Sequence, residues 1–218
     1  MKKQWKRLAA LSSAAVMAAG TLLYFPTDTL QNISWGITAS AEETGAVTWN
    51  EDNLTWTLDA DGTLTISGSG AMKDYSHDSP AYSNSKIKKV VIEDGITSIG
   101  AAAFLGCRSL TSITIPSSVT SIGDFALSEC TGLTSINISE GVTSIGNGAF
   151  SDCSSLTDIT IPSSVTSIGD HTFYGCSSLT SIEIPSNVTS IGDYAFQSCT
   201  GLTSINISEG VTSIGNGA

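Results

Sequence analysis

The chain has 218 residues, of which 40% are hydrophobic, and it carries nine Lys and Arg against twenty Asp and Glu, a formal net charge of −11 at pH 7. No Lys or Arg follows Arg108. Nucleic acids and anionic lipid surfaces both attract basic protein surfaces, so this composition excludes nucleic acid and disfavours an anionic membrane surface as a partner. The length suffices for one substantial core.

Residues 1–41 are predicted to be a secretory signal peptide. Four basic residues lie within positions 2–7, an apolar run extends from Leu8 to Phe25, and Ala39-Ser40-Ala41 supplies small residues for cleavage near Ala41. An uncleaved membrane anchor is the alternative, because the apolar run is near the short limit for spanning a bilayer. We favour cleavage, which predicts a secreted or cell-surface protein of bacterial type. Contact with a membrane is then limited to this segment before cleavage.

Residues 42–86 differ in composition from residues 87–218 and are predicted to form a β-rich N-terminal cap. Apolar residues alternate with polar ones over 54–58 and 64–66, and Asp-Ala-Asp-Gly separates the two runs, a pattern typical of a β-hairpin. Asp59 and Asp61 also match part of a calcium-binding loop, but the remaining ligands are absent, so a plain turn is favoured.

Residues 87–218 are built from one sequence repeated every 23 residues. A full copy begins at Ile99, the frame returns four more times, and a sixth copy begins at Ile214, which makes five full and two partial repeats. Self-similarity at this period predicts a solenoid in which each copy is one coil.

Seven apolar positions recur in each repeat, among them the leading Ile, a Phe or Leu five places later, a Cys at eight and a Leu at eleven. Leu-x-x-Ile-x-Ile predicts one strand and Val-Thr-Ser-Ile a second. Four repeats then place Asp or Asn after a Gly, which predicts a helix N-cap and a short helical turn; these residues are Asp124, Asn147, Asp170 and Asp193. The predicted fold is a mainly β solenoid with short helical turns, preceded by a β-hairpin cap.

The consensus IG-x-x-A-F-x-x-C-x-x-L-T-S-I-x-I-P-x-x-V-T-S resembles the BspA-type leucine-rich repeat of bacterial surface proteins. The stretch TWTLDADGTLTISGSGAM resembles the leader that often precedes such arrays, so the resemblance covers roughly residues 53–218. The chain departs from the general leucine-rich pattern, because Val stands where Asn or Cys is usual. The resemblance implies a leucine-rich repeat array with a secreted or cell-surface role in adhesion or protein binding. It supplies no catalytic residues.

The five cysteines all occupy one repeat position, and they are predicted to be buried free thiols. Disulfides between neighbouring coils are the alternative, although an odd number cannot pair fully within one chain. A zinc site is disfavoured because no Cys-x-x-Cys occurs. A catalytic pair of His171 with Cys176 is also disfavoured, because this Cys belongs to the buried row. His77-Asp78-Ser79 has no accompanying triad motif.

The candidate binding residues point outward from the first predicted strand of each coil, where stacking at about 4.8 Å would align them in a polar, mildly acidic strip. A plain solvated sheet is an equally weighted interpretation, because the strip lacks Trp, Tyr and Arg. The strip comprises Ser112, Thr114, Ser135, Asn137, Asp158, Thr160, Ser181, Glu183, Ser204 and Asn206.

These features predict a secreted or cell-surface module that binds an extracellular protein or glycan through its repeats, without enzymatic activity, metal or cofactor. A stalk that displays another domain is one alternative, and an accessory region of an enzyme whose catalytic domain lies beyond residue 218 is another. The repeat stops at Ala218 without a cap, so we expect truncation at the C-terminus. Residues 131–149 and 200–218 are identical, which suits either a repetitive ligand or a spacer.

Overall fold

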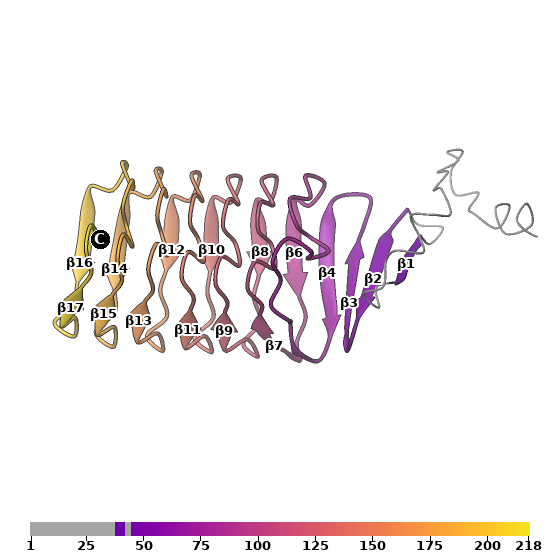
Figure 1. Ribbon diagram of the computed structural model, residues 1–218, viewed down its shortest axis with the longest axis horizontal. Coiled ribbons are helices and arrows are strands. Elements are labelled where there is room, and N and C mark those ends of the chain that lie inside the picture. Colours follow the sequence, from indigo (N-terminus) through magenta and orange to yellow (C-terminus); the bar gives the residue numbers. More distant parts are fainter. Residues whose placement is uncertain (1–37, 42–44) are drawn as a thin grey trace, which may run out of the picture.

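The computed structural model describes residues 38–41 and 45–218, so most of the predicted signal peptide lies outside the described residues. Within this part of the chain the repeats form a β-solenoid, whose coils stack side by side along one long axis (Figure 1). The predicted fold class is therefore confirmed, including the hairpin that precedes the repeats.

The N-terminal part is a sheet that continues into the solenoid. β2 (Val47–Glu51), β3 (Leu54–Leu58) and β4 (Thr63–Gly68) pair antiparallel in chain order, and β4 then pairs in parallel with β6 (Lys89–Ile92). β1 (Thr38–Ala41), which falls in the predicted signal peptide, pairs with the outer edge of β2. The turn between β3 and β4 is closed by Asp59, whose Oδ1 accepts hydrogen bonds from the N–H groups of Asp61 (3.0 Å) and Thr63 (2.8 Å). Asp59 therefore acts as a turn residue.

Aromatic side chains join this sheet to the first full coil. Trp56 is fully buried, and its ring centroid lies 6.0 Å from that of Tyr75 and 5.8 Å from that of Phe104. Tyr75 donates a hydrogen bond to the buried carboxylate of Glu51, which also forms an ion pair with Lys73. The sheet thus covers the apolar end of the repeat array, which would otherwise lack a neighbour.

Each coil consists of two short strands joined by turns, because the two alternating apolar segments are separated by Pro or Glu-Gly on one side and by Gly on the other. The first strands are β8 (Ser112–Thr114), β10 (Ser135–Asn137), β12 (Asp158–Thr160), β14 (Ser181–Ile184) and β16 (Ser204–Ile207). The second strands are β7 (Ile96–Ile99), β9 (Ser121–Ile122), β11 (Ser144–Ile145), β13 (Ser167–Ile168), β15 (Ser190–Ile191) and β17 (Ser213–Ile214), with the short β5 (Gly70–Ala71) beside β7.

Successive coils are aligned by parallel ladders with a register of one repeat. Ser135 lies opposite Asp158, for example, and Ser181 opposite Ser204. Threonine side chains reinforce this register, as where Thr143 Oγ1 donates to the carbonyl of Thr120, 3.2 Å away. On the first-strand face the hydrogen-bonded pairs are β6–β8, β10–β12 and β14–β16, so that the ladder is interrupted between β8 and β10 and between β12 and β14.

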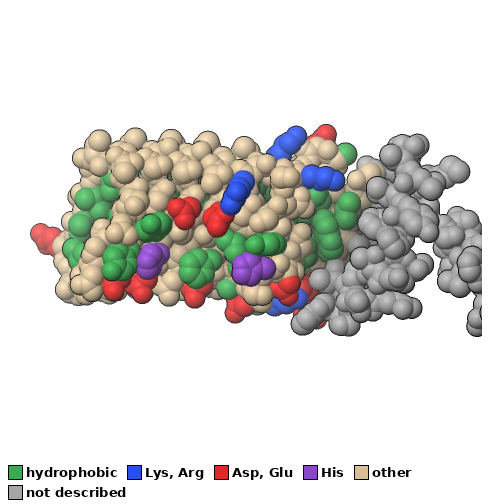
Figure 2. All heavy atoms as spheres, turned by 45° about the horizontal axis from the view of Figure 1, so that its top comes forward, with side chains coloured by type: hydrophobic (Ala, Val, Ile, Leu, Met, Phe, Trp, Pro, Cys, Tyr) green, Lys and Arg blue, Asp and Glu red, His purple; other side chains and the backbone are tan. Residues whose placement is uncertain are grey.

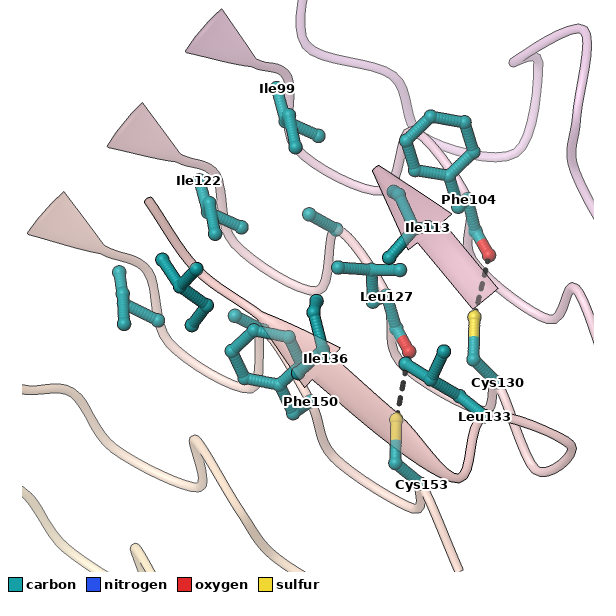
Figure 3. Packing of buried hydrophobic residues seen from close by; sticks show 14 of the residues in the cluster. Ile99, Phe104, Ile113, Ile122, Leu127, Cys130, Leu133, Ile136, Phe150 and Cys153 are labelled. Atoms are coloured by element: carbon teal, nitrogen blue, oxygen red, sulfur yellow. Dashed lines mark hydrogen bonds between the residues drawn. The ribbon is translucent and has the colours of Figure 1, made fainter. Parts of the chain in front are cut away.

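The core is a set of parallel rows, one residue from each coil in each row (Figure 3). The predicted rows of Ile, Phe or Leu, Cys, Leu and Val are buried through most of the array. An eighth buried row was not counted among the seven apolar positions, although its Ala is part of the repeat consensus: Ala103, Ala126, Ala149, Thr172 and Ala195. At the last coil Ile205, Ile207 and Ile214 are exposed. Among the described residues there is no helix long and apolar enough to cross a bilayer.

The predicted short helical turns are wrong, because no described residue is helical. The segment after each Gly has left-handed backbone at two places, three and seven residues after the leading Ile, and a helix cannot pass through such residues. Between them, N–H groups donate to the neighbouring coil, as in Phe125 N to Asn147 O (2.9 Å) and Leu127 N to Ala149 O (2.9 Å). This segment, residues 124–130 and its equivalents in the other coils, is called the turn face below.

The Asp and Asn residues expected as helix caps have a different role. Asp124 Oδ1 accepts a hydrogen bond from the N–H of Asn147 at 2.7 Å, and Asn147 Oδ1 accepts one from Asp170 N at 2.9 Å. Asp170 and Asp193 continue this series toward the C-terminus. Each side chain therefore links one coil to the next instead of closing a helix.

Candidate binding surface

The outward strand strip lies on the first strands of five successive coils. All ten predicted residues are exposed, and on β8, β10, β12 and β14 they alternate with buried Ile residues. The paired strands align Asn137 with Thr160 and Glu183 with Asn206. The structure therefore brings the predicted strip residues together as neighbours along the solenoid axis.

A depression of about 440 Å³ lies on this strip between β12 and β14, where the hydrogen-bonded ladder is interrupted. Asp158 and Thr160 line it from β12, and Ser181 and Glu183 line it from β14. Strip residues of two adjacent coils thus border one hollow, whose lining also includes apolar residues such as Ile159 and Ile182. No sequence pattern signals it, because it depends on which neighbouring strands are hydrogen-bonded.

The depression is acidic. Glu140 joins Asp158 and Glu183 in its lining, and no basic residue does. Glu140 is held by Ser163, whose N–H and Oγ both donate to Glu140 Oε2, at 3.1 and 3.0 Å. The hydroxyl and carboxylate groups that line the depression suit a ligand that donates hydrogen bonds or carries positive charge. Among the residues that the structure describes, no group of three His, Cys, Asp or Glu is placed to hold a metal ion.

The five cysteines are buried free thiols, as predicted. Each Sγ donates a hydrogen bond to a carbonyl of the preceding coil, at 3.3 Å for Cys130 to Phe104 and 3.2 Å for Cys153 to Leu127 (Figure 3). Burial raises the pKa of Cys107 and Cys153 to about 12. A thiol with so high a pKa is neither a nucleophile nor a metal ligand at neutral pH.

His171 is exposed, as its interpretation as a surface residue predicts, whereas Cys176 is buried and its thiol donates to Phe150 O at 3.2 Å. Its imidazole lies beside two aromatic rings, with centroids 5.8 Å from that of the half-buried Tyr174 and 5.1 Å from that of the exposed Tyr194. His77 packs against Tyr82 with a centroid separation of 5.0 Å. Neither His is therefore paired with a candidate nucleophile.

Sequence reasoning missed a second exposed surface. Phe125 is 47% exposed and Tyr194 38% exposed, and with His171 they occupy the left-handed position three residues after the leading Ile. Figure 2 shows hydrophobic and His side chains in a row along this face, with acidic side chains beside them. The equivalent residues in the sequence are Ala102, Phe125, Gly148, His171, Tyr194 and Gly217. Such mixed residue types give no periodic signal.

The stacked coils, the row of leucines and the exposed parallel strands define a leucine-rich repeat protein. Residues 76–177 and 129–218 match the family described as BspA type leucine rich repeat region (6 copies), which together is more than half of the chain. The chain belongs to this family, and the predicted resemblance is confirmed.

Two solved structures illustrate the likeness. A leucine-rich repeat protein of T. pallidum aligns with a TM-score of 0.62 at 24% identity, over 76% of this chain and 85% of that one. A leucine-rich repeat protein from Bacteroides ovatus ATCC 8483 aligns with a TM-score of 0.50 at 26% identity, over 76% of this chain and 55% of that one. Comparison with curated protein sequences finds no match.

Proposed function

We propose that this protein is a secreted or cell-surface binding module that recognises an extracellular protein or glycan through the outward strand strip. The observation that carries the proposal is the depression between β12 and β14, which brings the carboxylates of two adjacent coils around one hollow with a partly apolar lining. A solvated spacer needs no such hollow. Binding without catalysis fits the burial of every repeat thiol and the position of His171 among aromatic rings.

The proposed location follows from residues 1–41 and from membership in a family of bacterial repeat proteins. Export with cleavage after Ala41 would remove β1 and leave β2 as the edge of the sheet. Mass spectrometry of the exported chain should then give Glu42 as its first residue. A chain that keeps residues 1–41 in the membrane fraction would instead show an uncleaved anchor.

The binding proposal is tested by titrating the purified protein against immobilised extracellular matrix proteins and a panel of glycans. For any ligand retained, the double variant Asp158→Asn/Glu183→Gln should weaken binding at least tenfold, because it removes two carboxylates that line the depression. The matched control is Glu209→Gln, which changes an exposed acid outside the depression. Equal affinity of the double variant and the unmodified protein would remove the strip as the binding surface.

A stalk remains the second candidate, because residues 131–149 and 200–218 are identical and give the array repeated surfaces. Failure of every ligand to bind, with the folded protein intact, would favour the stalk.

A further inference from the structure

The turn face carries a cluster of aromatic rings near the C-terminal end of the array, in which His171 and Tyr194 are exposed and Tyr174 is half-buried. His171, Tyr174 and Tyr194 form it, with ring centroids 5.8 and 5.1 Å from the central imidazole. Two coils earlier Phe125 is exposed on the same face. Figure 2 shows hydrophobic and His side chains along this face, with acidic side chains beside them.

The fold does not require an aromatic residue at this repeat position, because Ala102, Gly148 and Gly217 occupy it in other coils. Phe125, His171 and Tyr194 have φ of 54–56°, a left-handed conformation that disfavours bulky residues, and two coils place Gly148 and Gly217 at the same position. Phe125 and Tyr194 are 47% and 38% exposed, so a large part of each ring remains accessible to a partner. Strained and exposed residues of this kind are typical of binding sites.

The rings lie across the neighbouring coil rather than projecting alone. A Cβ added to Gly148 would come within 2.4 Å of Phe125 Cε1, and one added to Gly217 within 2.8 Å of Tyr194 Cδ1. The rings therefore cover the glycines beside them and present a surface that extends along the solenoid axis.

Carboxylates border the aromatic cluster on both sides. Asp170 and Asp193 directly precede His171 and Tyr194, and both are fixed by hydrogen bonds from the next coil. On the other side Asp152 points toward the next coil, where its Oδ1 would lie 2.3 Å from a Cβ at Gly175, the residue after Tyr174. The cluster is thus an aromatic surface between negative charges.

The same face already binds a cation in an earlier coil. Arg108 donates to Glu129 Oε2 at 2.5 Å, and Glu129 is the repeat equivalent of Asp152. At Asp152 the chain offers no such partner, because no Lys or Arg follows Arg108 and the two ion pairs among the described residues involve Glu51 and Glu129. The exposed Asp152 accepts a hydrogen bond from Ser151 Oγ at 3.3 Å, and it has no cationic partner among the described residues.

We propose that the turn face around Asp152, His171, Tyr174 and Tyr194 binds a Lys- or Arg-containing segment of a partner polypeptide. Its ammonium or guanidinium groups pair with the carboxylates and lie over the ring faces, where cation–π attraction and stacking add to the ion pairs. The negative charge of this face excludes an anionic ligand. This surface differs from the strand strip, so the two proposals stand or fall separately.

The probe is a fluorescent dodecapeptide of alternating Gly and Arg, titrated by anisotropy at an ionic strength of about 0.1 M, where the screening length is about 10 Å. Asp152→Asn and Tyr194→Gly should each weaken binding about fivefold or more. Asn and Gly both accept left-handed backbone, so the variants should fold, and circular dichroism verifies this. Tyr194→Phe keeps the ring and should retain affinity. Glu209→Gln removes a carboxylate outside the cluster and should also retain affinity.

Three results would overturn the proposal. Unchanged affinity of Tyr194→Gly would mean that the peptide is held by net charge alone. A loss for Glu209→Gln as large as that for Asp152→Asn would mean the same. Binding of a neutral oligosaccharide in place of the Arg peptide, abolished by Tyr194→Gly, would assign the cluster to a glycan instead.

Discussion

Burial makes the repeat cysteines weaker acids than a cysteine in water. Burial raises the pKa of Cys107 and Cys153 to about 12 from an ordinary value of 9.0, and it raises those of Cys130, Cys176 and Cys199 as well. A thiol that stays protonated in the folded state but ionises when the chain unfolds links stability to pH.

The sign follows from proton counting. Below about pH 9 the thiols are protonated in both the folded and the unfolded state. Their titration therefore contributes no pH dependence to the free energy of unfolding in this range. Between about pH 9 and 12 the unfolded state has released the proton while folded Cys153 retains it, so stability falls as pH rises. Each such thiol contributes a loss of about 1.4 kcal/mol per pH unit in this window. Urea unfolding at a series of pH values from 7 to about 10.5 measures the slope.

The matched comparison is Cys153→Ala, which removes one thiol and leaves the Lys and Tyr groups that also titrate in this range. Its stability should be lower at pH 7, because the side chain is fully buried, and should fall less steeply above pH 9. Parallel pH profiles for the two proteins would contradict the assignment of this slope to the buried thiol.

At the scale of the element, the Gly that follows each second strand is required by the spacing of the coils. A Cβ at Gly146 would lie 2.6 Å from the backbone N of Asp124 in the preceding coil, whereas at Gly169 the nearest backbone atoms are 3.3 Å away. Gly146→Ala should therefore destabilise the protein by about 1–3 kcal/mol, the usual cost of overpacking. Gly169→Ala should cost less, and thermal unfolding of the two variants compares them. If Gly146→Ala and Gly169→Ala lowered the stability equally, the backbone of adjacent coils would be able to move apart after the Gly to accommodate a Cβ.

The strands were predictable and the turn face was not, for a physical reason. Alternation of Ile with Ser or Thr fixes which side of a strand is buried, and it needs no knowledge of the neighbouring coil. The Asp at 124 carries the same local signal as a helix cap, yet its side chain binds the next coil. The left-handed backbone conformation of Phe125 likewise accompanies a hydrogen bond to the next coil, from Phe125 N to Asn147 O. Local sequence does not contain that bond.

The candidate binding surfaces likewise include features that the sequence predicts and features that it does not. The exposure of strip residues such as Asp158 and Glu183 follows from alternation, and the structure places them as the pattern predicts. The depression between them depends on an interruption of the ladder between β12 and β14. The aromatic cluster at His171 depends on contacts between residues a full repeat apart, which no single repeat shows.

For the whole molecule, stability is a sum over coils and over the interfaces between them. The Phe row makes this visible, since Phe173 stacks on Phe150 at 5.6 Å and on Phe196 at 5.3 Å between ring centroids. Phe173 is fully buried, whereas Phe196 is 8% exposed and stacks on a ring on one side. An interior coil thus contributes two interfaces, and the coil near the C-terminal end contributes one through this row.

Phe173→Ala should therefore cost about 3–5 kcal/mol, the range for a buried Phe, and Phe196→Ala should cost less. Because neighbouring coils depend on one another, the loss at Phe173 should also speed amide hydrogen exchange in the coils on both sides, whereas the loss at Phe196 should affect the C-terminal coils alone. Urea unfolding measures the first comparison and exchange the second. If both variants lost the same free energy of unfolding and faster exchange were confined to the substituted coil, each coil would be stable without its neighbours. A chain of independent coils could not hold in place a binding surface that two adjacent coils form together.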